Sequence, residues 1–548
     1  MFFSLVIFII AQFNPASELQ DIYSSSYFTT AFLMKGVEEY IVNPSYLHLL
    51  SNVHLLTNFR DFRDPSNFFV IGGNLSTEPL REGGLVRIGG TKAALDNSLG
   101  FKGYSRKDTV EYADLDSNGV SDRAILKKFE TNGDSTFFHL SGYAGFQFLF
   151  EDWYIAASLM KKQESFDAEI PGSLENPLGY FAYREIEVTY PDYSFVKLVE
   201  AKGDYLKKGT ENLSHVRLGG GYFFPDSSFV SILVGYRILE DRLTNGAYYS
   251  FTTDLDTTRQ EIHYTVEQFR EDEEKSLEGN GFSFEVNFFR PKGRSSREIS
   301  LAFTRDKQNA DTIWKLSTGY VGVFNTVSDT FVSQYDSTGF KETYYTSTRG
   351  KSRNYFKGSY SEVIELNENF RLGFGINGYF SYLNFPRTYS FLDSTEVIFS
   401  DGDTMPQDSD DYSRYVFYRM TGFESDEEKK YELQIPFGVE VNPFGFKRVA
   451  LRAGTIFSLT HQEISTEKRY TPSGVAIDST FRGDSTSSVK TWSVAESRYR
   501  NSYLEEIGKV YFLYGVSLDV SENFQLAIIL KHDTEKFRTA SVSAVLRF

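Results

Sequence analysis

The chain of 548 residues contains no cysteine, which excludes disulfide bonds, thiolate metal sites and a thiol nucleophile. Proline and methionine are scarce, at 14 and 5 residues. Beyond residue 11, no segment reaches the roughly 18 consecutive apolar residues that a transmembrane helix requires. The mean hydropathy of -0.34 also excludes a bundle of apolar membrane helices.

Positive charge is in deficit as well, because 57 Lys and Arg face 74 Asp and Glu, a formal net charge of -17. The chain has no basic run with interleaved aromatic residues, so nucleic acid is not a predicted partner. What the sequence does have is aromatic residues: 51 Phe and 36 Tyr favour β-strands. The length fits several ordinary domains or one large β architecture, and this composition favours the second.

The N-terminus carries a ten-residue apolar run, Phe2 to Ala11, too short to span a bilayer and suited to the core of a signal peptide. We expect residues 1–11 to be a signal peptide that is cleaved after Ala11. The departure from this pattern is that no Lys or Arg precedes Lys35. An apolar first strand or a buried helix is the alternative.

Paired segments with period-two alternation dominate the rest of the chain. In FFHLSGYAGFQFLF (137–150) one face is apolar and the other is mostly polar, and after Glu151-Asp152 the chain returns as WYIAASLM. This pattern predicts a tight hairpin. Five similar hairpins are predicted to turn at 225–228, 291–296, 367–369, 442–446 and 521–523.

The connections between these hairpins are long and polar, some forty residues each, at 166–211, 241–279, 306–352, 384–428 and 461–506. Short turns that alternate strictly with long connections are typical of an outer-membrane barrel, with turns in the periplasm and loops outside. A β-sandwich would share the apolar and polar faces, but it would not keep its long connections at one end.

The strand count follows from these segments. Six hairpins, a closing strand at 537–548 and one strand within 83–112 predict an all-β, transmembrane, antiparallel up-and-down β-barrel of about 14 strands. If 52–59 and 85–90 also span the membrane, the count becomes 16. We expect residues 12–82 to form an N-terminal hatch or plug segment. Residues 83–548 would form the barrel with long extracellular loops.

Asn43, Pro44 and Ser45 open the stretch NPSYLHLL within this N-terminal segment. Together with about fourteen strands, a leader and a C-terminal Phe, they resemble the FadL-like long-chain fatty-acid transporters and the PorV-like secretion-associated barrels. The resemblance implies that Asn43, Pro44 and Ser45 lie in a hatch inside the barrel, with Ser45 in place of the family's usual Ala. It covers nearly the whole chain in architecture, but its specific motif is three residues long.

The predicted function is an integral outer-membrane β-barrel that acts as a passive channel or transporter for small molecules. A hydrophobic solute is implied by the resemblance alone. The alternative is a non-transporting structural or secretion-accessory barrel that binds protein partners through its long loops. Expected partners are outer-membrane lipid and lipopolysaccharide and the barrel-assembly machinery. The identity of the substrate does not follow from the sequence.

A calcium site is predicted in ADLDSNGVSDR, because its oxygen-bearing residues have the spacing of a calcium loop around Gly119. Ile125 stands where an EF-hand has its bidentate Glu, so the segment resembles the shorter Asp-rich loops. The alternative is a solvated turn rich in Asp and Gly. The predicted ligands are Asp114, Asp116, Asn118, Val120 and Asp122; no other cofactor is expected.

No enzymatic activity is predicted, since the chain contains neither H-E-x-x-H nor G-x-S-x-G. A barrel hydrolase built from a His and a distant Ser or Asp remains an open alternative. His139 and His215 are predicted to face the lumen.

The chain ends in SVSAVLRF, an alternating segment that closes the predicted barrel. Counting back from the end, its lipid face would carry Phe548, Leu546, Ala544 and Val542. A terminal aromatic residue in such a strand resembles the signal by which outer-membrane proteins are recognised for assembly.

Overall fold

The computed structural model describes residues 37–50, 52–60, 68–97, 99–114, 117–174, 179–190, 192, 195–255, 261–328, 331–400, 412–443, 448–482, 484–493, 497–533 and 537–548. These contain the helix α4 (Val37–Val42), the 3-10 helix η1 (Pro44–Leu49) and one 20-stranded sheet. None of the described helices is long and apolar enough to cross a membrane. The expected signal peptide, residues 1–11, lies outside the described residues.

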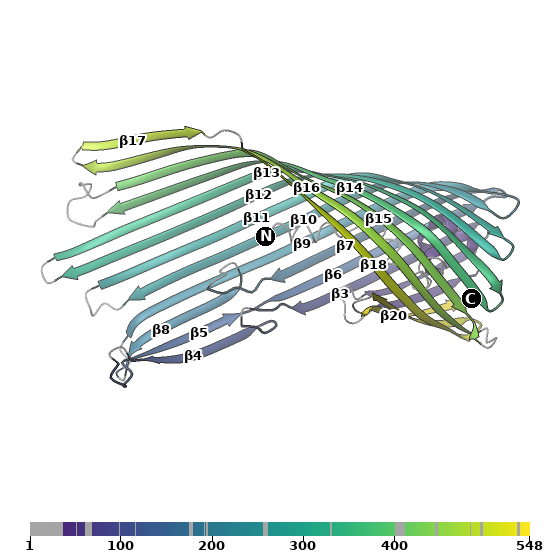
Figure 1. Cartoon of the computed structure of the whole chain (residues 1–548), viewed down its shortest axis with the longest axis horizontal. Helices are drawn as coiled ribbons and strands as arrows, with labels where there is room; N and C mark the ends of the chain where they lie inside the picture. Colours follow the sequence, from purple (N-terminus) through teal and green to yellow (C-terminus); the bar gives the residue numbers. More distant parts are fainter. Residues whose placement is uncertain are drawn as a thin grey trace.

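Most of the sheet is a closed antiparallel barrel of 16 strands (Figure 1). The ring closes where β1 pairs with β20, with Leu55 opposite Leu546. Closure leaves the ring without a free strand edge, the condition for a sheet that crosses lipid. In ring order the strands are β1 (His54–Arg60), β2 (Phe68–Thr77), β3 (Leu80–Ala94), β6 (Asp134–Leu149), β7 (Trp153–Glu169), β9 (Phe195–Phe223), β10 (Phe229–Leu255), β11 (Glu261–Lys292), β12 (Ser295–Ser328), β13 (Phe331–Asn367), β14 (Phe370–Ser400), β15 (Tyr412–Val441), β16 (Val449–Arg482), β18 (Ser497–Ser521), β19 (Phe524–Asp533) and β20 (Phe537–Arg547).

The remaining four strands extend the sheet outside the ring. β4 (Ser105–Ala113) pairs with β5 (Arg123–Thr131), β5 pairs with β8 (Phe181–Thr189), and β8 pairs with the first part of β9. β17 (Asp484–Ser493) pairs with the end of β16.

The all-β barrel is confirmed, but the expected count of fourteen is wrong and the alternative of 16 is right. All six predicted hairpins form. The main count left out β1 and β2, in the region assigned to the hatch; the alternative count named 52–59, which is β1, but β2 was not predicted. The barrel therefore begins at His54 rather than at residue 83. These strands are short, and their inward side chains include His54 and Asn74, which hydrogen-bond through Nδ1 and Oδ1 at 2.9 Å. The inward Leu56 and Val70 of the same strands are apolar, because they belong to a buried apolar cluster, and they break the alternation of apolar and polar residues by which a strand is recognised.

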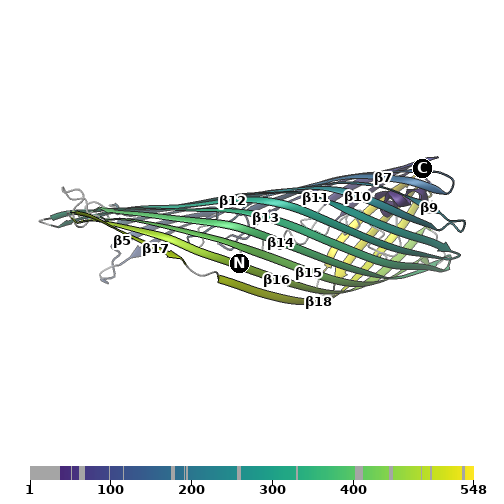
Figure 2. The same ribbon diagram turned by 90° about the horizontal axis from the view of Figure 1, so that it is seen from above.

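The polar segments expected to be long outer loops are mostly strands. β9 to β16 are 27 to 37 residues long, whereas about 9–11 residues cross a bilayer. Figure 1 shows them running far beyond the closed end of the barrel, and Figure 2 shows the molecule flattening in that direction. Their Thr, Tyr, Ser and Val suit a paired sheet that meets water on both faces.

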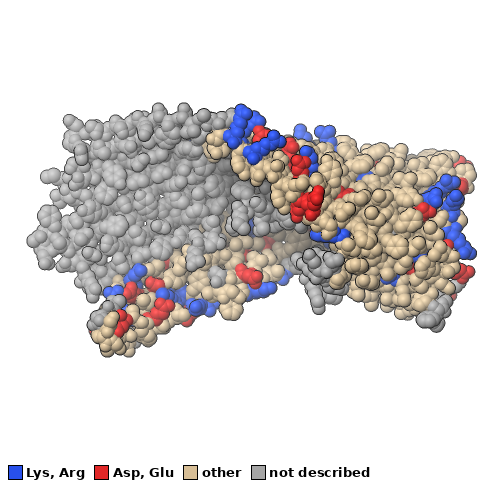
Figure 3. Space-filling model, in the orientation of Figure 1, with Lys and Arg blue, Asp and Glu red and all other residues tan. Residues whose placement is uncertain are grey.

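An apolar belt surrounds the closed part of the barrel. Its outward side chains are large and exposed, and the alternate residues of the same strands face inward and are largely polar. Figure 3 shows this uncharged surface, with charged side chains gathered along its borders. Members from different parts of the ring are Ile71, Val86, Ile155, Val234, Leu301, Ile376, Ile435, Val516, Ile528 and Val542.

Candidate functional site: a segment held in the barrel lumen

Residues 37–50 lie inside the barrel at the end where the short turns are, against β2, β3, β6 and β7. Their local fold follows from Asn43-Pro44-Ser45. Asn43 is the N-cap of η1, because its side-chain oxygen accepts a hydrogen bond from the backbone N–H of Ser45 at 3.0 Å. Pro44 occupies the first turn, where its missing N–H costs nothing. The motif therefore turns the chain from α4 into η1.

The apolar side of this segment packs on the inner wall. Ile41 and Leu47 are almost fully buried, and glycine at position 83 lets them approach the backbone of β3 closely. A Cβ atom at Gly83 would lie 2.8 Å from Leu47 Cδ2 and 3.1 Å from Ile41 Cγ2. The cluster comprises Ile41, Val42, Leu47, Leu50, Leu56, Val70, Leu85, Tyr143, Met160, Leu213 and Val545.

Arg217 of β9 holds the end of α4. Its Nη2 donates to the carbonyl oxygen of Val42 at 2.9 Å, and its Nε donates to Ser158 Oγ at 2.9 Å. The arginine is buried, so hydrogen-bond acceptors must replace the water that would otherwise stabilise its charge. The nearest carboxylate is Glu285 of β11, whose Oε2 lies 3.5 Å from Nη1.

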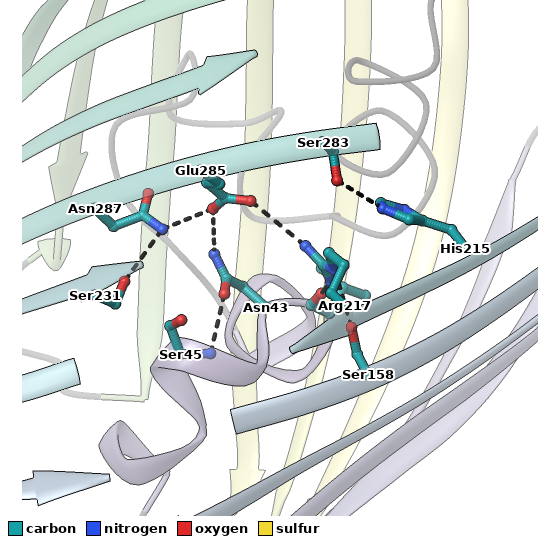
Figure 4. A network of polar contacts seen from close by, with 10 residues as sticks. Asn43, Ser45, Ser158, His215, Arg217, Ser231, Ser283, Glu285 and Asn287 are labelled. Atoms are coloured by element: carbon teal, nitrogen blue, oxygen red, sulfur yellow. Dashed lines mark hydrogen bonds and ion pairs between the residues drawn. The ribbon is translucent and has the colours of Figure 1, made fainter. Parts of the chain in front are cut away.

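Glu285 is the centre of the polar network in Figure 4. Its Oε1 accepts from Asn43 Nδ2 at 3.0 Å and from Asn287 Nδ2 at 2.7 Å. Asn287 also donates to Ser231 Oγ at 3.4 Å. One carboxylate thus joins the cap of η1, the arginine that binds α4 and the wall of the barrel. Hydrogen bonds to a charged group of this kind contribute about 1.5–3 kcal/mol each.

Further polar contacts hold η1. Tyr46 donates its hydroxyl proton to Glu298 Oε1 at 2.6 Å. Gln147 Nε2 lies 3.3 Å from the carbonyl oxygen of Ser45 and 3.1 Å from His48 Nδ1. The His48 ring packs edge-on against Phe229, with centroids 4.7 Å apart. Sequence reasoning missed Tyr46, Gln147 and Glu298, because partners 99 to 252 residues apart leave no local signal.

Charges elsewhere on the inner wall pair with one another. Arg237 Nη1 and Asp306 Oδ2 are 2.9 Å apart, and both side chains are buried. Farther around the ring, on β16 and β15, Arg452 Nε and Glu440 Oε2 are 2.6 Å apart. The inner wall is therefore charged but internally neutralised at these places.

One cluster has the residue types of a serine hydrolase. His139 Nδ1 lies 2.6 Å from Glu164 Oε1, and His139 Nε2 lies 3.3 Å from Ser141 Oγ. Ser141 is only 1% exposed, and Glu164 also pairs with Lys162 at 3.2 Å. A nucleophile must be reachable by its substrate, which this hydroxyl is not, so the cluster cross-links β6 and β7 in this state of the protein.

The predicted calcium ligands lie in the turn between β4 and β5. Asp114 accepts hydrogen bonds from the backbone N–H groups of Asn118 and Gly119, at 3.2 and 2.7 Å, as in a polar turn. The backbone N–H of Val120 donates to Asn118 Oδ1 at 2.7 Å, and Asp122 is the residue immediately before β5. Asp116 lies outside the described residues. In the part of the chain that the structure describes, no group of three acidic or His side chains could hold a metal ion, so calcium stays a prediction.

The predicted C-terminal signal lies in β20 and just after it. Val542 is exposed on the apolar belt, and Phe548 is 73% exposed, while Val545 between them is buried against the lumen segment. The backbone N–H of Phe548 donates to the carbonyl oxygen of Val53 at 2.8 Å. Leu546 and Ala544 share the outward parity of Val542 and are partly buried.

A closed ring of 16 antiparallel strands with an apolar outer belt and a polar inner wall is an outer-membrane β-barrel. No family model matches the chain, and neither does any curated protein. Among solved structures it is similar to a mutant ferric enterobactin receptor from Pseudomonas aeruginosa, with 9% identity, coverage of 91% of this chain and 80% of the other, and a TM-score of 0.25. It is also similar to a siderophore receptor from Acinetobacter baumannii, with 8% identity, coverage of 91% of this chain and 82% of the other, and a TM-score of 0.24.

The resemblance to FadL-like transporters is wrong. The barrel has 16 strands rather than fourteen, because β1 and β2 belong to the ring. At this low identity and TM-score, these receptors carry no conclusion about what the present chain transports or binds.

Proposed function

We propose that the protein is a gated outer-membrane pore in which residues 37–50 act as the gate. The proposal is supported by the way this segment is held: by the Glu285 network, by Arg217 and by Glu298, which binds Tyr46, all on the inner wall of the barrel. A barrel of about 16 strands is wide enough for an aqueous channel unless something fills it. A segment tied by hydrogen bonds can be displaced without breaking the barrel.

The chemistry of the wall favours small polar solutes over hydrophobic ones. Buried lumen side chains beyond the gate include Arg237, Asp306 and Gln308. A hydrophobic solute would have to remove water from these groups without replacing their hydrogen bonds, which is unfavourable.

Planar-bilayer conductance of Glu285→Ala tests the gate. The variant loses the acceptor shared by Asn43, Asn287 and Arg217, so we expect frequent openings where the wild type is mostly closed. Glu440→Ala is the matched control: its carboxylate is also on the lumen wall and paired with an arginine, but it touches no residue of the gate. Equal conductance in the wild type and both variants would contradict the gate.

The extended strands favour a second candidate, a barrel that binds protein partners outside the cell. β9 to β16 project well beyond the membrane, and β4, β5 and β8 widen the projecting sheet (Figure 1). A partner-binding barrel would stay closed in Glu285→Ala and would lose surface cross-links to other proteins when residues 105–131 are removed. The gated pore predicts the opposite result for conductance.

We also propose that the outward residues of β20 and Phe548 are read during assembly. Deleting Phe548 removes an exposed ring at the end of the strand that closes the barrel. We expect less heat-modifiable, folded protein in the outer membrane, with no comparable loss from Tyr499→Ala, which removes an exposed ring far from the seam. Equal amounts of folded protein from both variants would refute this role.

A further inference from the structure

A groove of about 760 Å³ lies in the outer wall across β13, β14, β15, β16 and β18. This volume is within the range of about 300–1,000 Å³ that is usual for ligand sites. Its apolar lining faces out of the barrel, because Phe356, Tyr431, Leu433 and Leu459 are exposed members of the apolar belt. The groove therefore opens toward the membrane and not toward the lumen.

One row across the groove, with one residue from each strand, has glycines at both ends and two exposed leucines, Leu433 and Leu459, between them. Neighbours in the row are opposite one another in the sheet: Gly358 faces Gly378, Gly378 faces Leu433, Leu433 faces Leu459, and Leu459 faces Gly508. A Cβ atom added at Gly378 would meet nothing within 4 Å. Five strands at a spacing of about 4.8 Å give the row a length of about 19 Å.

One wall and one end of the groove have a different chemistry. The rings of Phe380, Tyr431 and His461 form the wall, with centroid separations of 4.9 and 6.0 Å. At the end over β16 and β18, His461 Nδ1 lies 3.2 Å from Glu506 Oε1. Farther from the short turns, Lys429 Nζ pairs with Glu463 Oε2 at 3.3 Å.

We propose that this groove binds lipopolysaccharide, with acyl chains in the glycine gaps beside Leu433 and Leu459 and a phosphate near His461 and Lys429. The groove is continuous with the apolar belt, so the medium that it contacts is hydrocarbon. Narrow glycine gaps separated by leucine side chains along a row of about 19 Å fit thin acyl chains better than a second protein surface.

The position of the groove along the membrane normal shows which lipid leaflet it contacts. The groove lies on the side of the belt away from the short turns, which are periplasmic in barrels of this kind, so its polar end meets the outer leaflet. His461 and Lys429 supply donors for a phosphate there, while Glu463 and Glu506 can approach a divalent cation bound to it. Lipopolysaccharide is the phosphate-bearing, many-chained lipid of that leaflet.

Native mass spectrometry of the full-length protein in mild detergent, with purified lipopolysaccharide added, tests the proposal. Gly378→Leu and Gly508→Leu would each fill a glycine gap with a side chain, and both should lose most of the lipid-bound peak seen for the wild type. Gly142→Leu is the matched control, because Gly142 has the same outward parity and equally open space on β6, far around the ring. It should keep the peak.

Two further measurements make the outcome decisive. Heat-modifiable gel mobility must show that each variant is folded, and having two filling variants keeps the test open if one fails to assemble. Lys429→Ala should weaken retention of lipopolysaccharide while leaving the groove unfilled. Retention by both filling variants, equal loss from Gly142→Leu, or preferential retention of added phosphatidylethanolamine would overturn the proposal.

Discussion

Two regions of the barrel wall use their inner faces differently. The wall from β20 through β1 to β12 holds residues 37–50 through an apolar cluster, the Glu285 network and Glu298. On the wall from β14 to β16, inward charges such as Arg452 and Glu440 pair with each other. Among the described residues, the gate is therefore anchored to the wall from β20 to β12, and the wall from β14 to β16 carries ion pairs of its own instead.

Arg217→Ala should have the largest effect on the stability of the gate and on the conductance of the pore. It leaves Glu285 and the carbonyl of Val42 without their buried partner, and breaking a buried pair costs about 3–5 kcal/mol. We expect a lower transition temperature in heat-modifiable mobility and an open pore. Arg452→Ala on the other wall should leave the pore closed; if both variants open it, the anchoring is not one-sided.

Gly83→Ala should have the second-largest effect, a lower thermal stability of the gate. The added methyl group would press on Leu47 and Ile41, and overpacking of this kind costs about 1–3 kcal/mol. At the neighbouring Gly84→Ala the new atom would lie 3.4 Å from the carbonyl oxygen of Tyr143, close but clear of the gate. Thermal transitions that fall equally for both variants would contradict the close packing of the gate on β3.

Two substitutions of Asn43 distinguish its role as the N-cap of η1 from its role as the hydrogen-bond donor that ties η1 to Glu285. Asn43→Ala removes both and should destabilise the gate by about 0.5–2 kcal/mol for the cap alone. Asn43→Ser can still cap η1 but cannot reach Glu285 as the amide does. We expect more openings from Asn43→Ala than from Asn43→Ser, measured as open probability in planar bilayers; the reverse order would argue against a role for the cap.

The smallest effect is expected at Ser141. Because its hydroxyl is buried, a fluorophosphonate probe should not label the folded protein, and Ser141→Ala should match the wild type in conductance. Labelling that disappears in Ser141→Ala would instead show an accessible nucleophile beside His139 and would revive the hydrolase.

The sequence predicted the parts of the fold that have a local signal. Each turn such as Glu151-Asp152 is flanked by strands whose alternation sets an apolar face against lipid. The long strands were mistaken for loops because, beyond the membrane, water meets both faces and the alternation disappears. β2 was missed, and β1 was named only in the alternative count, because their inward Leu56 and Val70 are apolar and interrupt the alternation.

The candidate site was predictable only in part. Asn43, Pro44 and Ser45 stand out as a capped helix start, which is a local property. The partner Glu285 is 242 residues away, and no pattern in a single sequence links the two. The position of Arg217 opposite the carbonyl of Val42 is likewise a consequence of barrel closure and register.

The most direct test of the gate uses the absence of cysteine in the natural chain. In Asn43→Cys combined with Glu285→Cys, the substitutions remove the tether whose atoms are 3.0 Å apart, and a short bifunctional thiol reagent can restore a link at the same place (Figure 4). We predict that the double variant conducts in planar bilayers before cross-linking and closes after it. Conductance that is the same before and after cross-linking would contradict the gate.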